Sequence, residues 1–243
     1  MGNRNTTPRW LGVAAWLWIA VSVFYALFAL AVAASTAAAV AGLTEGPSTR
    51  AAPPVFAAHA VTGALALLAA AVQMGLGTPP SPRRRRLHRA VGRTYVATAA
   101  ATSLLSVPVV AAFDVDTLTR AGFLGEATLW LATTVTAYVH IRAGRVARHR
   151  EWMIRSFALA AFFVTFSLWD ALTGALPLPP TTAYTLAVFL AWSVNLTAAE
   201  VWIRAARTPV VTTRAVVTSA PASPRTSLRR PAGGSRQQWS PDR

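Results

Sequence analysis

The sequence predicts an all-α integral membrane protein, built as a bundle of six transmembrane helices with a disordered C-terminal tail. Hydrophobic residues make up 54% of the 243 residues and charged residues only 13%, whereas a soluble domain carries about 25% charged residues. The apolar residues gather in runs close to the roughly 20 residues that a helix needs to cross a bilayer. All 23 basic residues are arginines, and most of them lie between these runs.

Charged and turn residues divide the apolar sequence into six predicted spans. Residues 1–9 precede them as a predicted cytoplasmic segment, and the membrane domain covers 10–206. The stretch 207–243 is rich in proline, serine and arginine, a composition that cannot bury a core, so we expect a disordered basic tail. The spans are predicted at 10–41, 54–76, 90–112, 121–141, 152–173 and 182–204.

The positions of the arginines predict the orientation of the spans. With the N-terminus inside, 21 arginines fall on the inner side, and only Arg50 and Arg120 fall in outer loops. Basic residues concentrate on the cytoplasmic side of membrane proteins. We therefore expect a multi-pass protein of the plasma (inner) membrane with both termini cytoplasmic. The use of arginine without lysine indicates a GC-rich bacterial genome.

Two arginine-rich hairpins resemble each other. "RRRRLHRAVGRTYV" (83–96) and "RHREWMIRSF" (148–157) each re-enter the membrane through a His-Arg pair followed by another arginine. One interpretation is a parallel repeat of a two-helix unit. Both entrances would lie on the cytoplasmic face.

The repeated histidines give the first candidate site, an anion-binding or cofactor-binding site at the cytoplasmic face. Arginines that obey the positive-inside pattern need no function, and arginines near a helix end can extend to the headgroups. That account does not explain a histidine beside each arginine pair. The hypothesis places seven residues in this site: His88, Arg89, Arg93, His149, Arg150, Arg155 and Glu200.

Arg155 and Glu200 are ionisable residues inside predicted spans, where charge is costly and usually functional. Their similar depth favours an ion pair between helices. Each also has a local competitor four residues away, Glu151 for Arg155 and Arg204 for Glu200.

A second and weaker candidate lies near the outer ends of the spans. His59, Glu126 and Asp170 could bind a divalent cation or carry protons. The alternative is that Glu126 and Asp170 only mark helix ends near water. The chain has no cysteine, which excludes thiolate metal sites and cysteine nucleophiles.

Four segments resemble the signature blocks of a bacterial multi-pass membrane family known as domain of unknown function 2306. They are "HAVTGALALLAAAVQ", "LHRAVGRTYV", "HREWMIRSFAL" and "AWSVNLTAAEVWI". The resemblance covers roughly 55–204 and implies no established activity. By resemblance, ten residues occupy motif positions: His59, His88, Arg89, Gly92, Arg93, His149, Arg150, Trp152, Arg155 and Glu200.

Three interpretations of function follow. The first is an inner-face site for an anion, such as an anionic lipid headgroup. The second is a membrane redox protein with one b-type haem held by two of His88, His140 and His149, and with arginines beside its propionates. The third is an accessory subunit or small transporter without chemistry of its own. We expect the lipid bilayer as partner and no nucleic acid; the sequence identifies no catalytic residues and leaves enzyme activity open.

Overall fold

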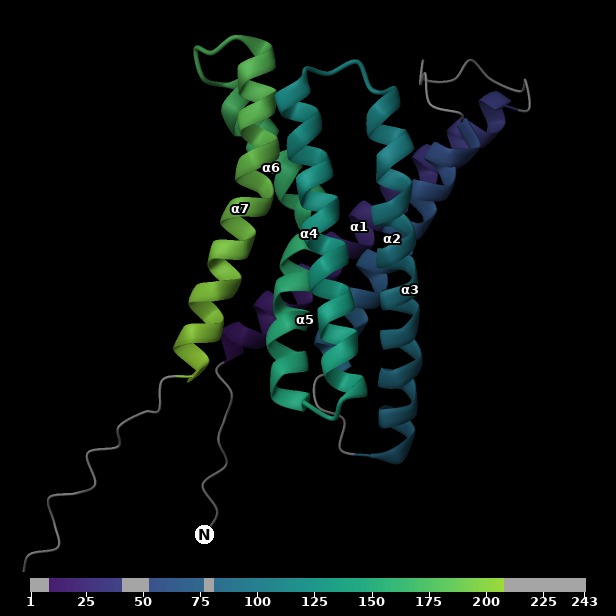
Figure 1. The fold of residues 1–243 in the computed structure, drawn as a ribbon, viewed down its shortest axis with the longest axis vertical. Coiled ribbons are helices and arrows are strands. Elements are labelled where there is room, and N and C mark those ends of the chain that lie inside the picture. The colour runs from purple at the N-terminus through teal and green to yellow at the C-terminus, as the bar shows by residue number, and fades with distance from the viewer. Residues whose placement is uncertain (1–8, 41–52, 77–80, 208–243) are drawn as a thin grey trace, which may run out of the picture. The chain divides into compact units, whose positions relative to one another are not determined.

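The computed structural model describes residues 9–40, 53–76 and 81–207, and every regular element among them is a helix (Figure 1). The predicted all-helical class is therefore confirmed. From Thr208 onward the predicted tail lies outside the described residues. The helices are α1 (Arg9–Val40), α2 (Pro53–Leu76), α3 (Pro82–Ala112), α4 (Thr117–Arg142), α5 (Val146–Ala160), α6 (Phe162–Gly174) and α7 (Pro180–Arg207).

Within the described ranges, fewer than six helices meet the length and apolarity expected of a membrane span. Among the described residues, α2 over Pro54–Met74, α3 and α7 do so, and α5 with α6 gives a fourth span if the bent pair counts as one. α1 contributes a shorter apolar stretch, Ile19–Ala34, within the part of this helix whose side chains the structure describes. α4 carries Glu126 and many threonines, which lower its hydropathy. The structure thus supports a membrane protein with three to four candidate spans.

Neighbouring helices pack closely through small residues. α2 packs on α1 and α3, α4 on α3 and α5, and α7 on α6, α5 and α4. Five alanines of α2 are buried, which allows the close helix approach that is common in membranes. Large apolar side chains instead point outward, including Phe24, Leu104, Val201 and Trp202. This arrangement suits lipid as the surrounding solvent.

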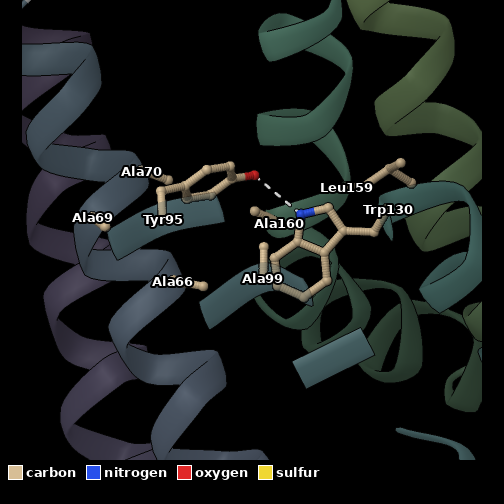
Figure 2. Close-up of a cluster of buried hydrophobic side chains, with 8 residues drawn as sticks. All are labelled: Ala66, Ala69, Ala70, Tyr95, Ala99, Trp130, Leu159 and Ala160. Atoms are coloured by element: carbon tan, nitrogen blue, oxygen red, sulfur yellow. Dashed lines mark hydrogen bonds between the residues drawn. The ribbon is translucent and has the colours of Figure 1, made fainter. Parts of the chain in front are cut away.

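Two clusters of buried side chains form the core. One gathers Tyr95, Trp130 and Leu159 with alanines of α2, α3 and α5 (Figure 2). The other contains Phe162, Val188 and Ala191. Trp192 packs against both clusters, so α7 connects them.

The predicted fifth span, 152–173, is broken. α5 ends at Ala160, α6 begins at Phe162, and their axes differ by 45°. Asn195 of α7 holds the break, because its Nδ2 donates to the Ala158 carbonyl (3.0 Å) and to Thr165 Oγ1 (2.9 Å). Helix kinks usually occur at proline or glycine, or where a side chain enters the backbone ladder. The stretch 152–173 contains no proline and no glycine, so the break is not recognisable from the sequence.

α3 begins eight residues earlier than the predicted span at 90–112. Ser81 caps it by accepting a hydrogen bond from the Arg84 N–H (3.3 Å), and Pro82 occupies the first turn, where its missing N–H costs nothing. The arginines that were expected in a loop are therefore helical. His88 and Arg93 lie on a continuous helix that extends beyond the apolar part.

Asp116 caps the start of α4 and joins it to α7. Its Oδ1 accepts hydrogen bonds from the Leu118 and Thr119 N–H groups (2.9 and 3.0 Å), and its Oδ2 accepts from the Thr119 and Thr185 hydroxyls (2.5 and 3.3 Å). The hydroxyl of Thr119, followed by its N–H, holds the pKa of the Asp116 carboxyl below its ordinary value of 3.8. All these donors favour the charged form.

We predict that Asp116→Ala lowers the melting temperature of the detergent-solubilised protein by a few degrees, because the cap and its bond to α7 are lost together. Since the pKa is depressed in the folded state, the stabilisation is present above the ordinary value and fades as the pH falls through the folded pKa. Thermal unfolding at pH 7 and at pH 3 measures both effects. Asp116→Asn, which keeps an acceptor, is the matched control. Equal stability of Asp116→Ala and wild type at pH 7 would contradict the prediction.

Candidate functional site

Three basic segments lie at one end of the helix bundle, at the bottom of Figure 1. They are the start of α3, the turn between α4 and α5, and the end of α7. We call this the basic end, and define it by its arginines and histidines. These are Arg83, Arg84, Arg85, Arg86, His88, Arg89, Arg93, His140, Arg142, Arg145, Arg148, His149, Arg150, Arg155, Arg204 and Arg207.

Arg155 and Glu200 form a two-point ion pair between α5 and α7. Arg155 Nε donates to Glu200 Oε1 at 2.5 Å, and Nη2 donates to Oε2 at 3.1 Å. The guanidinium also lies 4.6 Å from the centre of the Trp152 ring, and the Arg155 side chain is only 16% exposed. The structure thus contains the pair between helices. Glu151, the local competitor, pairs with Arg207 instead (Nε to Oε1, 2.7 Å).

His88 and His149 lie close enough for their ring charges to interact. His149 Nδ1 is 2.9 Å from the Ala137 carbonyl oxygen. Since a carbonyl only accepts, Nδ1 carries a proton, and in the neutral form of the ring Nε2 then keeps its lone pair. His88 Nδ1 is buried and has no hydrogen-bond partner among the described residues, and the same holds for Nδ1 of His140.

The remaining predicted residues of the basic end face outward. Arg89, Arg93 and Arg150 are exposed, and within the described ranges none of them pairs with a carboxylate. The structure therefore brings the seven predicted residues together as three groups. One is the His88–His149 pair, the second is the Arg155–Glu200 pair, and the third is the set of exposed arginines on the same end.

Gly92 allows close contact between α2 and α3. Gln73 Nε2 donates to the His88 carbonyl at 2.5 Å. A Cβ at Gly92 would lie 3.0 Å from that same nitrogen, so a larger residue would push Gln73 away. Gln73 thereby fixes the backbone that carries His88. Gln73 ends the sequence block "HAVTGALALLAAAVQ", but the sequence alone does not indicate its contact with His88.

A buried hydrogen-bond network connects α3, α4 and α5, and sequence reasoning missed it. Tyr95 Oη accepts from Trp130 Nε1 (3.0 Å; Figure 2) and lies 2.6 Å from Ser156 Oγ. Ser156 Oγ is also 2.7 Å from Thr134 Oγ1, which donates to the Trp130 carbonyl (2.7 Å). We call these four residues the Tyr95 network. Ser156 directly follows Arg155, so the network fixes the position of the ion pair.

His59, Glu126 and Asp170, the second candidate set, have separate surroundings. His59 Nδ1 is 3.3 Å from the Thr102 carbonyl oxygen and helps to join α2 to α3. Glu126 is buried in α4, and Asp170 is exposed on α6. Across the described ranges, no group of three or more histidines or carboxylates is placed to hold a metal ion.

The bundle and its lipid-facing apolar surface define the class: this is a helical membrane protein. The chain belongs to the family described as "Predicted membrane protein (DUF2306)", whose model matches residues 56–203. The resemblance seen in the four sequence blocks is thereby confirmed. No curated protein and no solved structure matches the chain.

We predict that Tyr95→Phe destabilises the bundle by about 1–3 kcal/mol, the usual cost of leaving buried hydrogen-bond partners unsatisfied. The change removes one hydroxyl and leaves Trp130 Nε1 and Ser156 Oγ without this partner. Equilibrium unfolding in detergent measures the loss. Tyr138→Phe, at an exposed tyrosine of α4, is the matched control and should be neutral. Equal effects of the two substitutions would show that the network contributes no stability.

Proposed function

We propose that the protein is a six-span plasma-membrane protein whose basic end, on the cytoplasmic face, binds an anionic group. The ligand that this chemistry fits best is the phosphate of an anionic lipid headgroup. Guanidinium groups bind phosphate oxygens through paired hydrogen bonds, and clusters of basic residues next to a span attract anionic lipids.

The observation that carries the proposal is the excess of unpaired positive charge at the basic end. Its two carboxylates, Glu151 and Glu200, are already occupied by Arg207 and Arg155. Arg89, Arg93 and Arg150 extend from two different helices, and no carboxylate of the described residues pairs with them. A phosphate would supply the missing negative charge.

The residues of the proposed site divide into two roles. Arg89, Arg93 and Arg150 would contact the phosphate, and the rings of His88 and His149 would add N–H donors. Arg155 and Glu200 neutralise each other, so they act as positioning residues that hold α5 against α7. Gln73 and Gly92 similarly position the His88 segment.

The packing of α4 supports its role as a span despite its polar composition. Thr119, Glu126, Thr133 and Thr134 are buried against other helices. Leu129, Val135 and Val139 face outward. A helix with its polar side chains turned inward can cross a bilayer, because its hydroxyls bond to carbonyls one turn back.

We predict that topology reporters fused after Gly46, Asp116 and Pro179 read as outside, and that fusions after Pro82 and Gly144 read as inside. The reason is the arginine distribution, which places the basic end in the cytoplasm. Reporter pairs that are active on only one side of the membrane measure this. An inside result at Asp116 would remove two spans and contradict the proposal.

Haem is a second candidate, favoured by one observation. The bond from His149 Nδ1 to Ala137 is the kind that orients a ligating imidazole and leaves Nε2 for the iron. His88, on the adjacent helix segment, interacts with His149. Haem bound there would supply one-electron redox chemistry, and the exposed arginines suit its propionates. An accessory subunit without a ligand is the third interpretation.

We predict that Arg150→Gln and Arg89→Gln each weaken the binding of purified protein to vesicles containing phosphatidylglycerol by about fivefold, since each basic residue near an anionic surface contributes about 1 kcal/mol. The binding should also weaken with added salt. Vesicle flotation measures it. Arg120→Gln, which removes the same charge at the opposite end, is the control.

The same variants distinguish the candidates. With a headgroup, Arg150→Gln is more harmful than His149→Ala. With haem the order is reversed, because His149→Ala abolishes the Soret band while Arg150→Gln only shifts it. Protein that was expressed with ample haem and shows no Soret band eliminates the haem candidate. Vesicle binding that is unchanged in both arginine variants contradicts the headgroup site.

A further inference from the structure

Glu126 is a buried carboxyl without a hydrogen-bond partner. It lies in the middle of the inward face of α4 and is only 8% exposed. Its Oε1 is fully buried and forms no hydrogen bond with any described residue. Burial without a partner strongly disfavours a carboxylate in a low-dielectric interior. A carboxyl in this position needs a ligand that removes or balances its charge.

The register between α4 and α7 puts Trp192 at the same level as Glu126, although no hydrogen bond joins the two side chains in this structure. The two helices run parallel, because Thr119 contacts Thr185 through their hydroxyls and a Cβ at Gly122 would meet Val188 Cγ1. One further turn along both helices leads from Gly122 to Glu126 and from Val188 to Trp192. Trp192 Nε1 is also buried and has no hydrogen-bond partner among the residues that the structure describes. An unpaired acceptor and an unpaired donor therefore lie at the same level of one interface.

The surroundings of Glu126 hold no compensating charge. α4 packs on α3, α5 and α7. Of their titratable side chains in the described part, Tyr95 of α3 is the one that interacts electrostatically with Glu126, and it is neutral under ordinary conditions. No arginine or histidine of the described ranges acts on Glu126. The apolar cluster around Trp130, one turn away on α4, takes Leu159 from α5 and Leu196 from α7.

The tight packing between α4 and α7 limits the size of any ligand that could balance the charge of Glu126. At Gly122, one turn away, even a single added carbon would lie 2.8 Å from Val188 and 3.1 Å from Phe189. An organic cation would need more space than this interface shows. A metal ion would need several oxygen or nitrogen ligands, and the described residues provide no such group. A proton needs neither.

We infer that Glu126 and Trp192 form a proton-binding site inside the bundle, separate from the basic end. Protonation forms one O–H bond on a carboxylate oxygen of Glu126 and consumes one proton from bulk water, with no oxidant or reductant. The neutral acid then has a carbonyl oxygen that can accept from the indole N–H of Trp192. The site lies beside the break between α5 and α6, since Phe162 and Trp192 share one cluster.

Infrared spectroscopy of the full-length protein in lipid vesicles tests this. At neutral pH the wild type should show the carbonyl-stretch band of a neutral carboxylic acid, and Glu126→Gln should remove it. Asp170→Asn, at an exposed carboxyl, should leave the band in place. Trp192→Phe should shift its frequency, because the donor to the acid carbonyl is lost.

A pH titration of the wild-type band guards against variants that fail to fold. The band should disappear reversibly as the pH is raised. A wild type without the band at neutral pH overturns the site, and so does a band that persists in Glu126→Gln. A band lost in Asp170→Asn assigns the proton to Asp170 instead. An unchanged frequency in Trp192→Phe overturns the part assigned to the indole. None of these outcomes depends on anion binding at the basic end.

Discussion

The hydrogen bonds around Tyr95 connect three helices in the buried interior of the bundle. A polar group in that region must find its partner inside the protein, because none is available outside. Tyr95, Trp130, Ser156 and Thr134 satisfy one another almost completely. This requirement fixes the rotation of α3, α4 and α5 about their axes. The positions of His88, His149 and Arg155 on those helices then follow.

The Arg155–Glu200 pair extends the same constraint to α7. Two hydrogen bonds between a guanidinium and a carboxylate hold both distance and orientation, so α7 cannot slide along α5 without breaking them. Asn195, one turn and a half earlier on α7, binds both sides of the α5–α6 break. α7 therefore holds both α5 and α6, the two halves of the broken helix, through polar contacts. This explains why polar residues occur in an apolar stretch such as "AWSVNLTAAE".

The sequence predicted the all-helical class, but the six spans are not confirmed and most side-chain contacts were missed. The all-helical class followed from the apolar runs, and the Arg155–Glu200 pair followed from the cost of isolated charge in a span. The break after Ala160 could not be predicted, because its cause is Asn195, which is distant in sequence. The Tyr95 network was invisible for the same reason, since its four residues come from three helices. Periodicity and charge report on one helix at a time, whereas these features depend on how helices are turned toward each other.

The buried polar side chains on the inward face of α4 differ in whether they have hydrogen-bond partners. Near the basic end, Thr134 and Trp130 have partners on α3 and α5, and that part of the bundle is fixed by hydrogen bonds. One turn from Trp130, Glu126 has none, although Tyr95 is near enough to interact with it. The bundle thus satisfies four neighbouring polar groups but leaves the Glu126 carboxyl without a partner among the described residues, near the broken helix. The gain or loss of a proton there changes the polarity of the interface between α4 and α7. At one end of that interface, the Asp116–Thr185 hydrogen bond holds α4 to α7, and at the other end side chains pack tightly around Trp130. Glu126 lies between these two contacts. A change in its protonation therefore acts on the part of the interface that has the fewest hydrogen bonds.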